Sequence, residues 1–384
     1  MNDSIYKIEN QIWNTVNTET RIGVLDGLSG IALFYSYLTK IIDNEEYHTK
    51  LITLVDRIDF LISEYEYDSS FSAGIAGYGW VLLKINNKSI EIDDNYFDSI
   101  DLILSETLRT NSENNYYDFL YGGIGIAMYF IERYKVNKNK IIETALIEFT
   151  NELLRKINSE IDILFTNPSE IVENKYYYFG LAHGISGFLN FLIRLKDTIK
   201  NLIPNIDSSL FEIIEFMSRY KKYDSESKQF YPAQVLIYNN EASSSRLGWC
   251  QGDLGIGNAI YNSGLFLNDK VLQDEGIELI YNTKKISIKE SKVIDFGICH
   301  GSSGLILQYH LASKKLNQNY SKIIDVWYEN LKKQTNDFVN FDSFFIDKYM
   351  PETNILNGAT GLALVLLTIE NKIETDWVEC LNLQ

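Results

Sequence analysis

Three consecutive copies of one short motif carry most of the side chains in this sequence that could do chemistry. They read "GLAHGISG", "RLGWCQGDLG" and "GICHGSSG", and each places a cysteine or histidine one or two residues before a Gly-x-x-Gly. Two of the three cysteines and two of the four histidines are placed in this way, namely Cys250, Cys299, His183 and His300. Equivalent positions in neighbouring repeats predict that these side chains share one pocket.

Three of these residues have the side chains of a zinc site. Zinc favours thiolate and imidazole ligands in tetrahedral geometry, so Cys250, Cys299 and His300 would leave the fourth position to water or substrate, as in catalytic sites. Helix N-termini close to the thiols would lower their pKa values and ease metal binding. The alternative is that the cysteines are small buried apolar side chains, since their spacing of 49 residues matches no compact zinc finger.

Three charged or titratable residues are candidates for the rest of the pocket. His183 has no cysteine beside it and would be a fourth ligand, a core histidine or an acid–base group, and a nearby metal favours the last. Arg246 precedes Cys250 by four residues, and Asp118 precedes Gly122 by four, so both would lie at the pocket edge. Taken alone, each is more simply a solvated charge.

The elements that would position these residues are repeated along the chain. Seven copies of Gly-x-x-Gly, each leading into an apolar run, follow one another at spacings of 47 to 68 residues, and they account for fourteen of the 23 glycines. We number these motif copies one to seven by their first glycines, which are Gly27, Gly74, Gly122, Gly184, Gly252, Gly301 and Gly358.

The apolar runs and the segments between them predict two kinds of helix. The runs after the motifs are apolar nearly all round, which is typical of helices buried on most faces. Residues 50–65, 140–157 and 208–222 instead show apolar residues at three- and four-residue steps. Such an alternation buries its apolar surface by closing into a ring. We therefore expect an all-α fold, an α/α toroid (barrel) of seven helix pairs, with all motifs at one end. For copies one, two and seven, we expect the glycines to serve packing alone.

The chain is expected to be a single domain over residues 1–384. The two longest intervals between motifs flank copy four. The first, around residues 159–178, is expected to be a loop. The second includes the strand-like run "AQVLIY", which predicts a small extension at about 218–246, between the fourth and fifth repeats.

Composition and charge exclude some classes of partner. The net charge of −17 and the pI of about 4.8 argue against nucleic acid, because phosphate binding needs a basic stripe and no cluster of Lys and Arg supplies one. The longest apolar stretch, "GLALVLLTI", is far shorter than a membrane span. Without a secretion signal, a cytoplasmic protein with free thiols or metal ligands is expected. Cys380 receives no role.

The motifs together resemble the lanthionine synthetase C-like family, the lanthipeptide cyclases. The resemblance extends over the whole chain and rests on the seven glycine motifs together with "GLAHGISG", "RLGWCQG" and "GICHGSSG" in that order. It implies a seven-fold α/α toroid with one Zn²⁺ per chain. Carried over by motif, the zinc ligands are Cys250, Cys299 and His300, the pocket acid–base is His183, and the functional arginine and aspartate are Arg246 and Asp118.

The sequence departs from the family pattern at a few positions. Gln251 follows the zinc cysteine where the family often has an aromatic residue or histidine, so a role of that side chain in proton handling is not carried over. Ser186 stands where a proline is common, and Asp253 and Leu254 replace a smaller or proline-containing pair. Asp118 matches mainly through its four-residue step to Gly122.

The resemblance also implies a reaction and its partners. A cysteine thiolate of a dehydrated precursor peptide, made of leader and core, would take the open zinc position. It would add in a Michael-type reaction to dehydroalanine or dehydrobutyrine of the same peptide and form a thioether ring, a lanthionine or methyllanthionine. Arg246 would stabilise the enolate and His183 would protonate it, while Asp118 would orient His183 or accept the thiol proton. A dehydratase and an export transporter are candidate partners.

Three other interpretations stay open. Protein prenyltransferase β-subunits also hold a zinc-bound thiolate in an α/α ring, but they have six helix pairs and an Asp-Cys-His ligand set. A noncatalytic zinc- or thiol-peptide-binding scaffold is disfavoured by intact His183 and Arg246. A cyclase-like protein could instead add glutathione to dehydrated residues.

Overall fold

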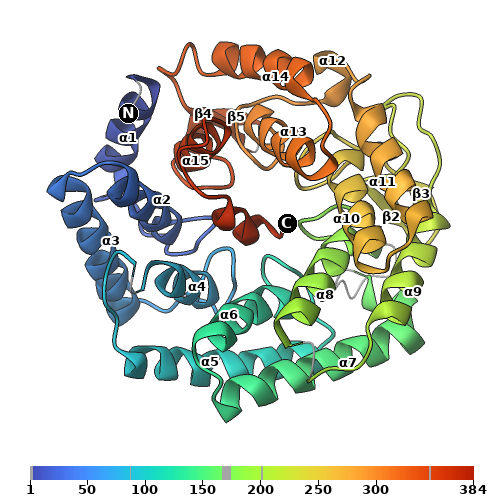
Figure 1. Cartoon of the computed structure of the whole chain (residues 1–384), viewed down its shortest axis with the longest axis horizontal. Coiled ribbons are helices and arrows are strands. Elements are labelled where there is room, and N and C mark those ends of the chain that lie inside the picture. Colours follow the sequence, from blue (N-terminus) through green and yellow to red (C-terminus); the bar gives the residue numbers. More distant parts are fainter. Residues whose placement is uncertain (1–2, 87, 167–173, 200–201, 346) are drawn as a thin grey trace.

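The fold is a ring of helices in two concentric layers. The computed structural model describes residues 3–86, 88–166, 174–199, 202–345 and 347–384. In Figure 1 the chain runs once around the ring and alternates between an outer and an inner helix. The predicted α/α toroid of seven helix pairs is confirmed within these residues.

The inner layer consists of the helices that follow the seven motifs. Their residues are buried along most of their length, as the apolar runs predict; in α15, for example, the first ten residues are all buried. The inner helices are α2 (Leu28–Ile41), α4 (Ile75–Ile85), α6 (Gly123–Val136), α8 (Ile185–Ile199), α10 (Asp253–Phe266), α13 (Ser302–Leu316) and α15 (Ala359–Ile369).

The outer layer consists of amphipathic helices with one face in water. Asparagine or aspartate side chains cap four of them at the N-terminus, as is usual for helices that begin at a surface. The outer helices are α1 (Asp3–Thr15), α3 (Glu45–Glu64), α5 (Asp94–Glu113), α7 (Lys140–Leu164), α9 (Asp207–Ser218), α11 (Lys270–Thr283) and α14 (Ser321–Gln334), with a single turn, α12 (Ile288–Ser291), before motif copy six.

The inner helices begin at Gly-x-x-Gly because the preceding loop folds back onto the first turn. In motif copy two, the amide of Ile75 donates to the carbonyl oxygen of Asp68 at 3.0 Å. A Cβ atom on Gly74 would lie 2.1 Å from that oxygen, and one on Gly77 would lie 2.0 Å from the carbonyl oxygen of Phe71. Both glycines therefore allow a close approach that any larger residue would block.

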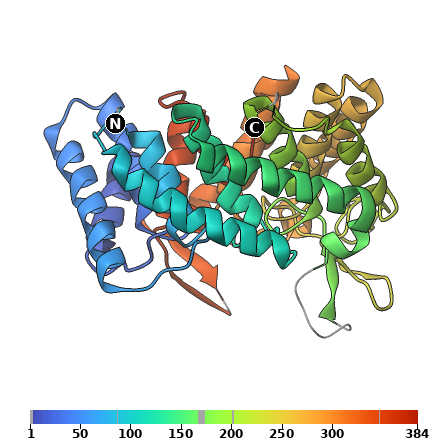
Figure 2. The same ribbon diagram turned by 90° about the horizontal axis from the view of Figure 1, so that it is seen from below.

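Two small sheets extend from the ring. The first is antiparallel, in the order β1–β2–β3, and consists of β1 (Tyr176–Tyr178), β2 (Gln234–Leu236) and β3 (Glu241–Ala242). The second is a hairpin of β4 (Asp342–Phe345) and β5 (Lys348–Pro351). Figure 2 shows both sheets protruding from the same side of the ring.

The predicted extension is present, but its composition differs from the expectation. Its strands β2 and β3 lie within 218–246, yet the third strand comes from the other long interval, which was expected to be a loop. Helix α7 also continues into that interval as far as Leu164, with a kink at Glu160. Residues 167–173, which complete the interval, lie outside the described residues. The β4–β5 hairpin was not predicted.

The end of the ring away from the motifs is closed by the last segment of the chain. A 3₁₀ helix, η2 (Asp376–Leu381), enters the centre of the ring in Figure 1, where Trp377 and Cys380 are fully buried. Glu379 of this segment pairs with Lys84 and, at 2.9 Å, with Arg194 of two inner helices. Cys380 is therefore a core residue. None of the described helices is long and apolar enough to cross a membrane.

Candidate functional site

The loops in front of the seven inner helices form a belt around one end of the ring. Backbone hydrogen bonds of 2.9 to 3.5 Å join six of the seven neighbouring pairs of loops within the described residues. These bonds run from Leu25 N to Ser72 O, Ser72 N to Leu120 O, Ala182 N to Cys250 O, Cys250 N to Cys299 O, Cys299 N to Leu356 O, and Leu356 N to Leu25 O. The belt therefore brings residues that are far apart in sequence together at one opening of the ring, which we call the mouth.

Glycines four residues before the motif allow the loops to approach so closely. A Cβ on Gly23 would lie 2.0 Å from the carbonyl oxygen of Ser72 in the next loop, and one on Gly180 would lie 1.9 Å from that of Cys250. Motif copies five and six carry the equivalent Gly248 and Gly297. In copy three this position is Asp118.

Copies three and four are joined by side chains instead. No backbone hydrogen bond connects their two loops in the part of the chain that the structure describes. The carboxylate Oδ2 of Asp118 lies 2.7 Å from Nδ1 of His183, and its Oδ1 accepts the amide of Tyr121 at 2.8 Å. The tight turn at Asp118 therefore orients the imidazole and leaves Nε2 free. The ring of Tyr121 stacks on the imidazole ring of His183, with the two ring centroids 6.0 Å apart.

The Asp118 partner changes the acidity of His183. Desolvation by the surrounding protein lowers its pKa, but the hydrogen bond and charge of Asp118 raise the pKa more, so that it lies above its ordinary value. Half of the side chain is exposed at the mouth, whereas the Asp118 carboxylate is largely buried. An imidazole in this arrangement keeps its proton to a higher pH than a free histidine.

The two predicted thiols meet where the loops of copies five and six are bonded. Cys250 and Cys299 are both free and partly buried, and their side chains share a hydrogen bond. This bond from Cys299 lowers the pKa of Cys250 against the opposing effect of burial, and the charges of His300 and Arg246 lower it further. The bond and burial raise the pKa of Cys299. These opposite shifts make Cys250 the more acidic of the two thiols.

His300 is anchored by an aspartate that the sequence did not single out. Its Nε2 lies 3.1 Å from Oδ2 of Asp295, whose side chain is 1% exposed. Asp295 also accepts the amides of Gly297 at 3.1 Å and of Phe344, in β4, at 3.2 Å. A buried acceptor at Nε2 orients the imidazole ring and leaves Nδ1 for another partner.

The donor set fits a zinc ion, although the described residues contain no group of three or more His, Cys, Asp or Glu side chains arranged to hold a metal. The two thiols are in hydrogen-bond contact, and the charge of His300 acts on Cys250. Asp295 holds the imidazole by its second nitrogen, as carboxylates do behind zinc-binding histidines. Two thiolates and an imidazole are three ligands of the kind that zinc takes, and a fourth position would remain for a substrate.

Arg246 supplies a positive charge beside the thiols. Its charge lowers the pKa of both Cys250 and Cys299. Its Nε is buried without a hydrogen-bond partner, and no ion pair to its guanidinium is found among the described residues. A guanidinium in this state is available to an anionic group of a ligand.

The structure therefore brings the six predicted site residues to one mouth. The charges of His300, Arg246 and His183 all act on Cys250, and Asp118 is bonded to His183. Sequence reasoning missed Asp295 and Tyr121. Tyr121 is the residue directly before Gly122, the position that His183 and His300 occupy in their own copies, so the repeat could have revealed it. Gln251 lies in the belt without an evident role.

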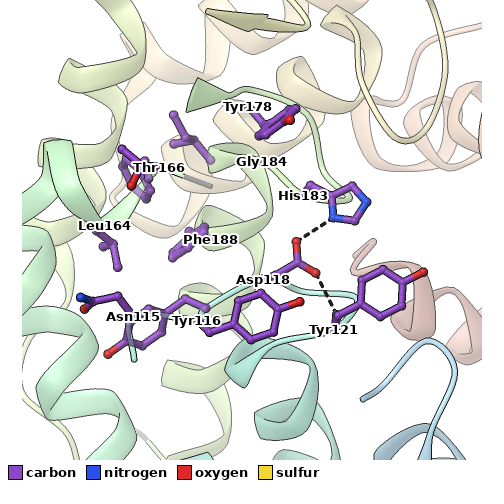
Figure 3. A pocket seen from close by; sticks show the side chains of 13 residues that line it. Asn115, Tyr116, Asp118, Tyr121, Leu164, Thr166, Tyr178, His183, Gly184 and Phe188 are labelled. Atoms are coloured by element: carbon purple, nitrogen blue, oxygen red, sulfur yellow. Dashed lines mark hydrogen bonds and ion pairs between the residues drawn. The ribbon is translucent and has the colours of Figure 1, made fainter. Parts of the chain in front are cut away.

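A cavity opens beside the Asp118–His183 pair. Figure 3 shows it between the loop of copy three, the end of α7, strand β1 and the start of α8. Its volume is about 330 Å³. It lies at the junction between copies three and four, whose loops share no backbone hydrogen bond within the described residues.

Comparisons with known proteins support the fold and the family resemblance that the repeats predict. A family model described as "Lanthionine synthetase C-like protein" matches residues 18–382. Among solved structures, one called "Nisin cyclase" is similar with a TM-score of 0.77 and 22% sequence identity, over 98% of this chain and 96% of that chain. At this identity the likeness establishes the fold. No curated protein sequence matches the chain.

Proposed function

Because the chain belongs to the lanthionine synthetase C-like family, we propose that it is a zinc-dependent lanthipeptide cyclase. It forms thioether rings by adding cysteine thiolates of a dehydrated precursor peptide to dehydroalanine or dehydrobutyrine of the same peptide. The observation that carries this proposal is the pairing of two contacting thiols with an oriented histidine at the same mouth.

The thiol side of the mouth prepares the nucleophile. A zinc ion bound by Cys250, Cys299 and His300 would supply the acidity that keeps a substrate thiol ionised at neutral pH. Asp295 fixes the orientation of His300 through Nε2, and the backbone bonds between the two loops fix the distance between the thiols. Precise positioning of this kind lowers the entropic cost of the reaction.

Arg246 and His183 would complete the addition. When the substrate sulfur bonds to the β-carbon, the electron pair of the double bond moves toward the carbonyl oxygen and forms an enolate. The unpaired guanidinium of Arg246 is available to stabilise this charge. His183, whose pKa is raised by Asp118, would donate the proton that the α-carbon requires. The net reaction joins thiol and alkene without a change in mass.

The test of this proposal is a cyclisation assay. Zinc-loaded protein is incubated with dehydrated peptides that contain cysteine, and the free thiol is titrated by alkylation while the peptide mass is followed. The proposal expects the thiol to disappear without a change in mass. If free glutathione is consumed and its mass is added to the peptide, the protein is an intermolecular thiol transferase instead. If zinc and peptide bind but the thiol persists, it is a scaffold.

A further inference from the structure

The cavity beside His183 is not needed by the thiol side of the mouth. Its floor is apolar, because Leu164 and Phe165 from the end of α7 and Phe188 from α8 are 4%, 6% and 7% exposed. Its rim carries the phenol rings of Tyr116 and Tyr178, which face the cavity in Figure 3. Burial, together with the charge of Asp118, raises the pKa of Tyr116 to about 12, so this rim stays neutral.

The described residues of the lining provide no partner for a charged side chain. Among them, the only charged or titratable members apart from the phenols are Asp118 and His183, and these two are bonded to each other. A charged group inside would lose its hydration without gaining an ion pair, which is costly. An apolar or aromatic side chain would gain from burial on the floor and from edge-to-face packing with the aromatic rings.

The position of the cavity indicates which part of a ligand reaches it. His183 lies at one end of the lining and points its free Nε2 away from Asp118. A peptide that presents an α-carbon to His183 has its neighbouring α-carbons only about 3.8 Å away along the chain. The side chain of an adjacent residue is therefore within reach of the floor.

We propose that this cavity is a subsite for an apolar or aromatic side chain of the peptide residue next to the dehydrated residue. This inference rests on the proposed cyclase function. The subsite selects which dehydrated residues are placed at His183, because a neighbour that fills the cavity holds the acceptor in position.

The experiment uses synthetic peptides with one dehydroalanine and one cysteine. The residue before the dehydroalanine, and in a second series the residue after it, is Leu, Phe, Asp or Lys. At one of the two positions, kcat/KM for Leu and Phe should exceed that for Asp and Lys by about tenfold or more. The same order is expected in the Kd of non-reactive peptides that have alanine in place of dehydroalanine.

A charge placed at the rim tests whether the preference comes from this cavity. Thr166 lines the cavity beside Leu164, and Thr166→Lys should favour the Asp peptide over the Leu peptide relative to wild type. Ser159→Lys adds the same charge to an exposed position of α7 outside the lining and should leave the preference unchanged.

The outcomes separate this subsite from the cyclase activity. Equal Kd values for all four peptides at both positions would overturn the subsite, whether or not rings form. A preference that Thr166→Lys and Ser159→Lys change equally would also overturn it. If the peptides bind with the expected order but no thiol is lost, the subsite stands and the proposed reaction fails.

Discussion

Two junctions of the belt differ in how they are built. Between motif copies five and six, backbone amides bond to a carbonyl oxygen of the next loop, and Gly248 allows the contact. Between copies three and four, Asp118 replaces this glycine and bonds to His183 by its side chain, and a cavity opens beside them. The closed junction holds the two thiols, whereas the open junction holds the Asp118–His183 pair and a cavity.

The comparison teaches that one position of the repeat can serve different purposes in different copies. A glycine at this position allows two loops to approach closely, as Gly23 and Gly180 do. Asp118 at the same position joins its loop to the next by a side-chain bond to His183, whereas Ser70 and Asn354 in copies two and seven leave the backbone bonds between loops in place. If the comparison is right, changes at the two junctions should have separable effects on metal binding and on proton transfer.

The largest effect is expected at the closed junction. Cys299→Ala removes one of the two contacting thiols, so both stoichiometric zinc and cyclisation should be lost. Elemental analysis measures the zinc content, and the thiol assay measures cyclisation. Cys380→Ala is the matched control, because Cys380 is buried in η2 away from the mouth, and it should keep its zinc. Equal zinc in both variants, or none in wild type, would contradict the assignment of the metal site.

The next largest effect is expected at the open junction. His183→Asn should lower the cyclisation rate by about 10²- to 10⁴-fold, the usual contribution of a general acid, with zinc content unchanged. His310→Asn, deep in α13 and outside the belt, is the control. A variant of His183 that lost its zinc as well would mean that the two junctions do not act separately.

A smaller effect is expected behind His300. Asp295→Asn weakens the acceptor that holds Nε2, so zinc affinity should fall by about 10- to 100-fold. Competition with a chelator measures the Kd. Asp347→Asn changes an exposed carboxylate in the β4–β5 hairpin and should have no effect. An unchanged Kd in Asp295→Asn would show that this contact only supports the hairpin.

The smallest effect is a shift in pH dependence. Asp118 raises the pKa of His183, so Asp118→Asn should lower it. The protonated acid is then lost at a lower pH, and the alkaline limb of the kcat/KM profile should move to lower pH. Asp43→Asn, at an exposed position between α2 and α3, should leave the limb in place. A limb that stays in place in Asp118→Asn would show that His183 is not the group that titrates.

Much of the fold followed from the glycines. Each Gly-x-x-Gly marks the start of a buried helix. In six of the seven copies the preceding loop packs against both glycines, whereas Gly255 of copy five meets the side chains of Leu181 and Gln308. The constraint is mostly local in sequence and could therefore be predicted. The pairing of Tyr177 in β1 with Val235 in β2 could not be predicted from the sequence. Such short strands carry little periodicity, and their pairing joins two distant intervals.

The candidate site could be predicted from the sequence to about the same extent as the fold. Equivalent positions in the repeats singled out the thiols and His183, since copies of one loop must face the same mouth. The bond between Asp118 and His183 depends on how two loops stack, which the repeat suggests only after the role of Gly248 and its equivalents is known. Asp295 stands six residues before Gly301, as Arg246 stands six before Gly252, but its contact with the second nitrogen of His300 depends on how the loop folds and could not be predicted from the motif.

The central claim is that the mouth joins a thiolate to a dehydrated residue and then protonates the α-carbon. The most direct test is to run the reaction of wild-type protein with a dehydrated peptide in D₂O and to measure free thiol and non-exchangeable deuterium by mass spectrometry. We predict that each thiol lost is matched by a single deuterium at an α-carbon. Loss of thiol without deuterium, as in disulfide formation, or no loss of thiol at all, would contradict the account.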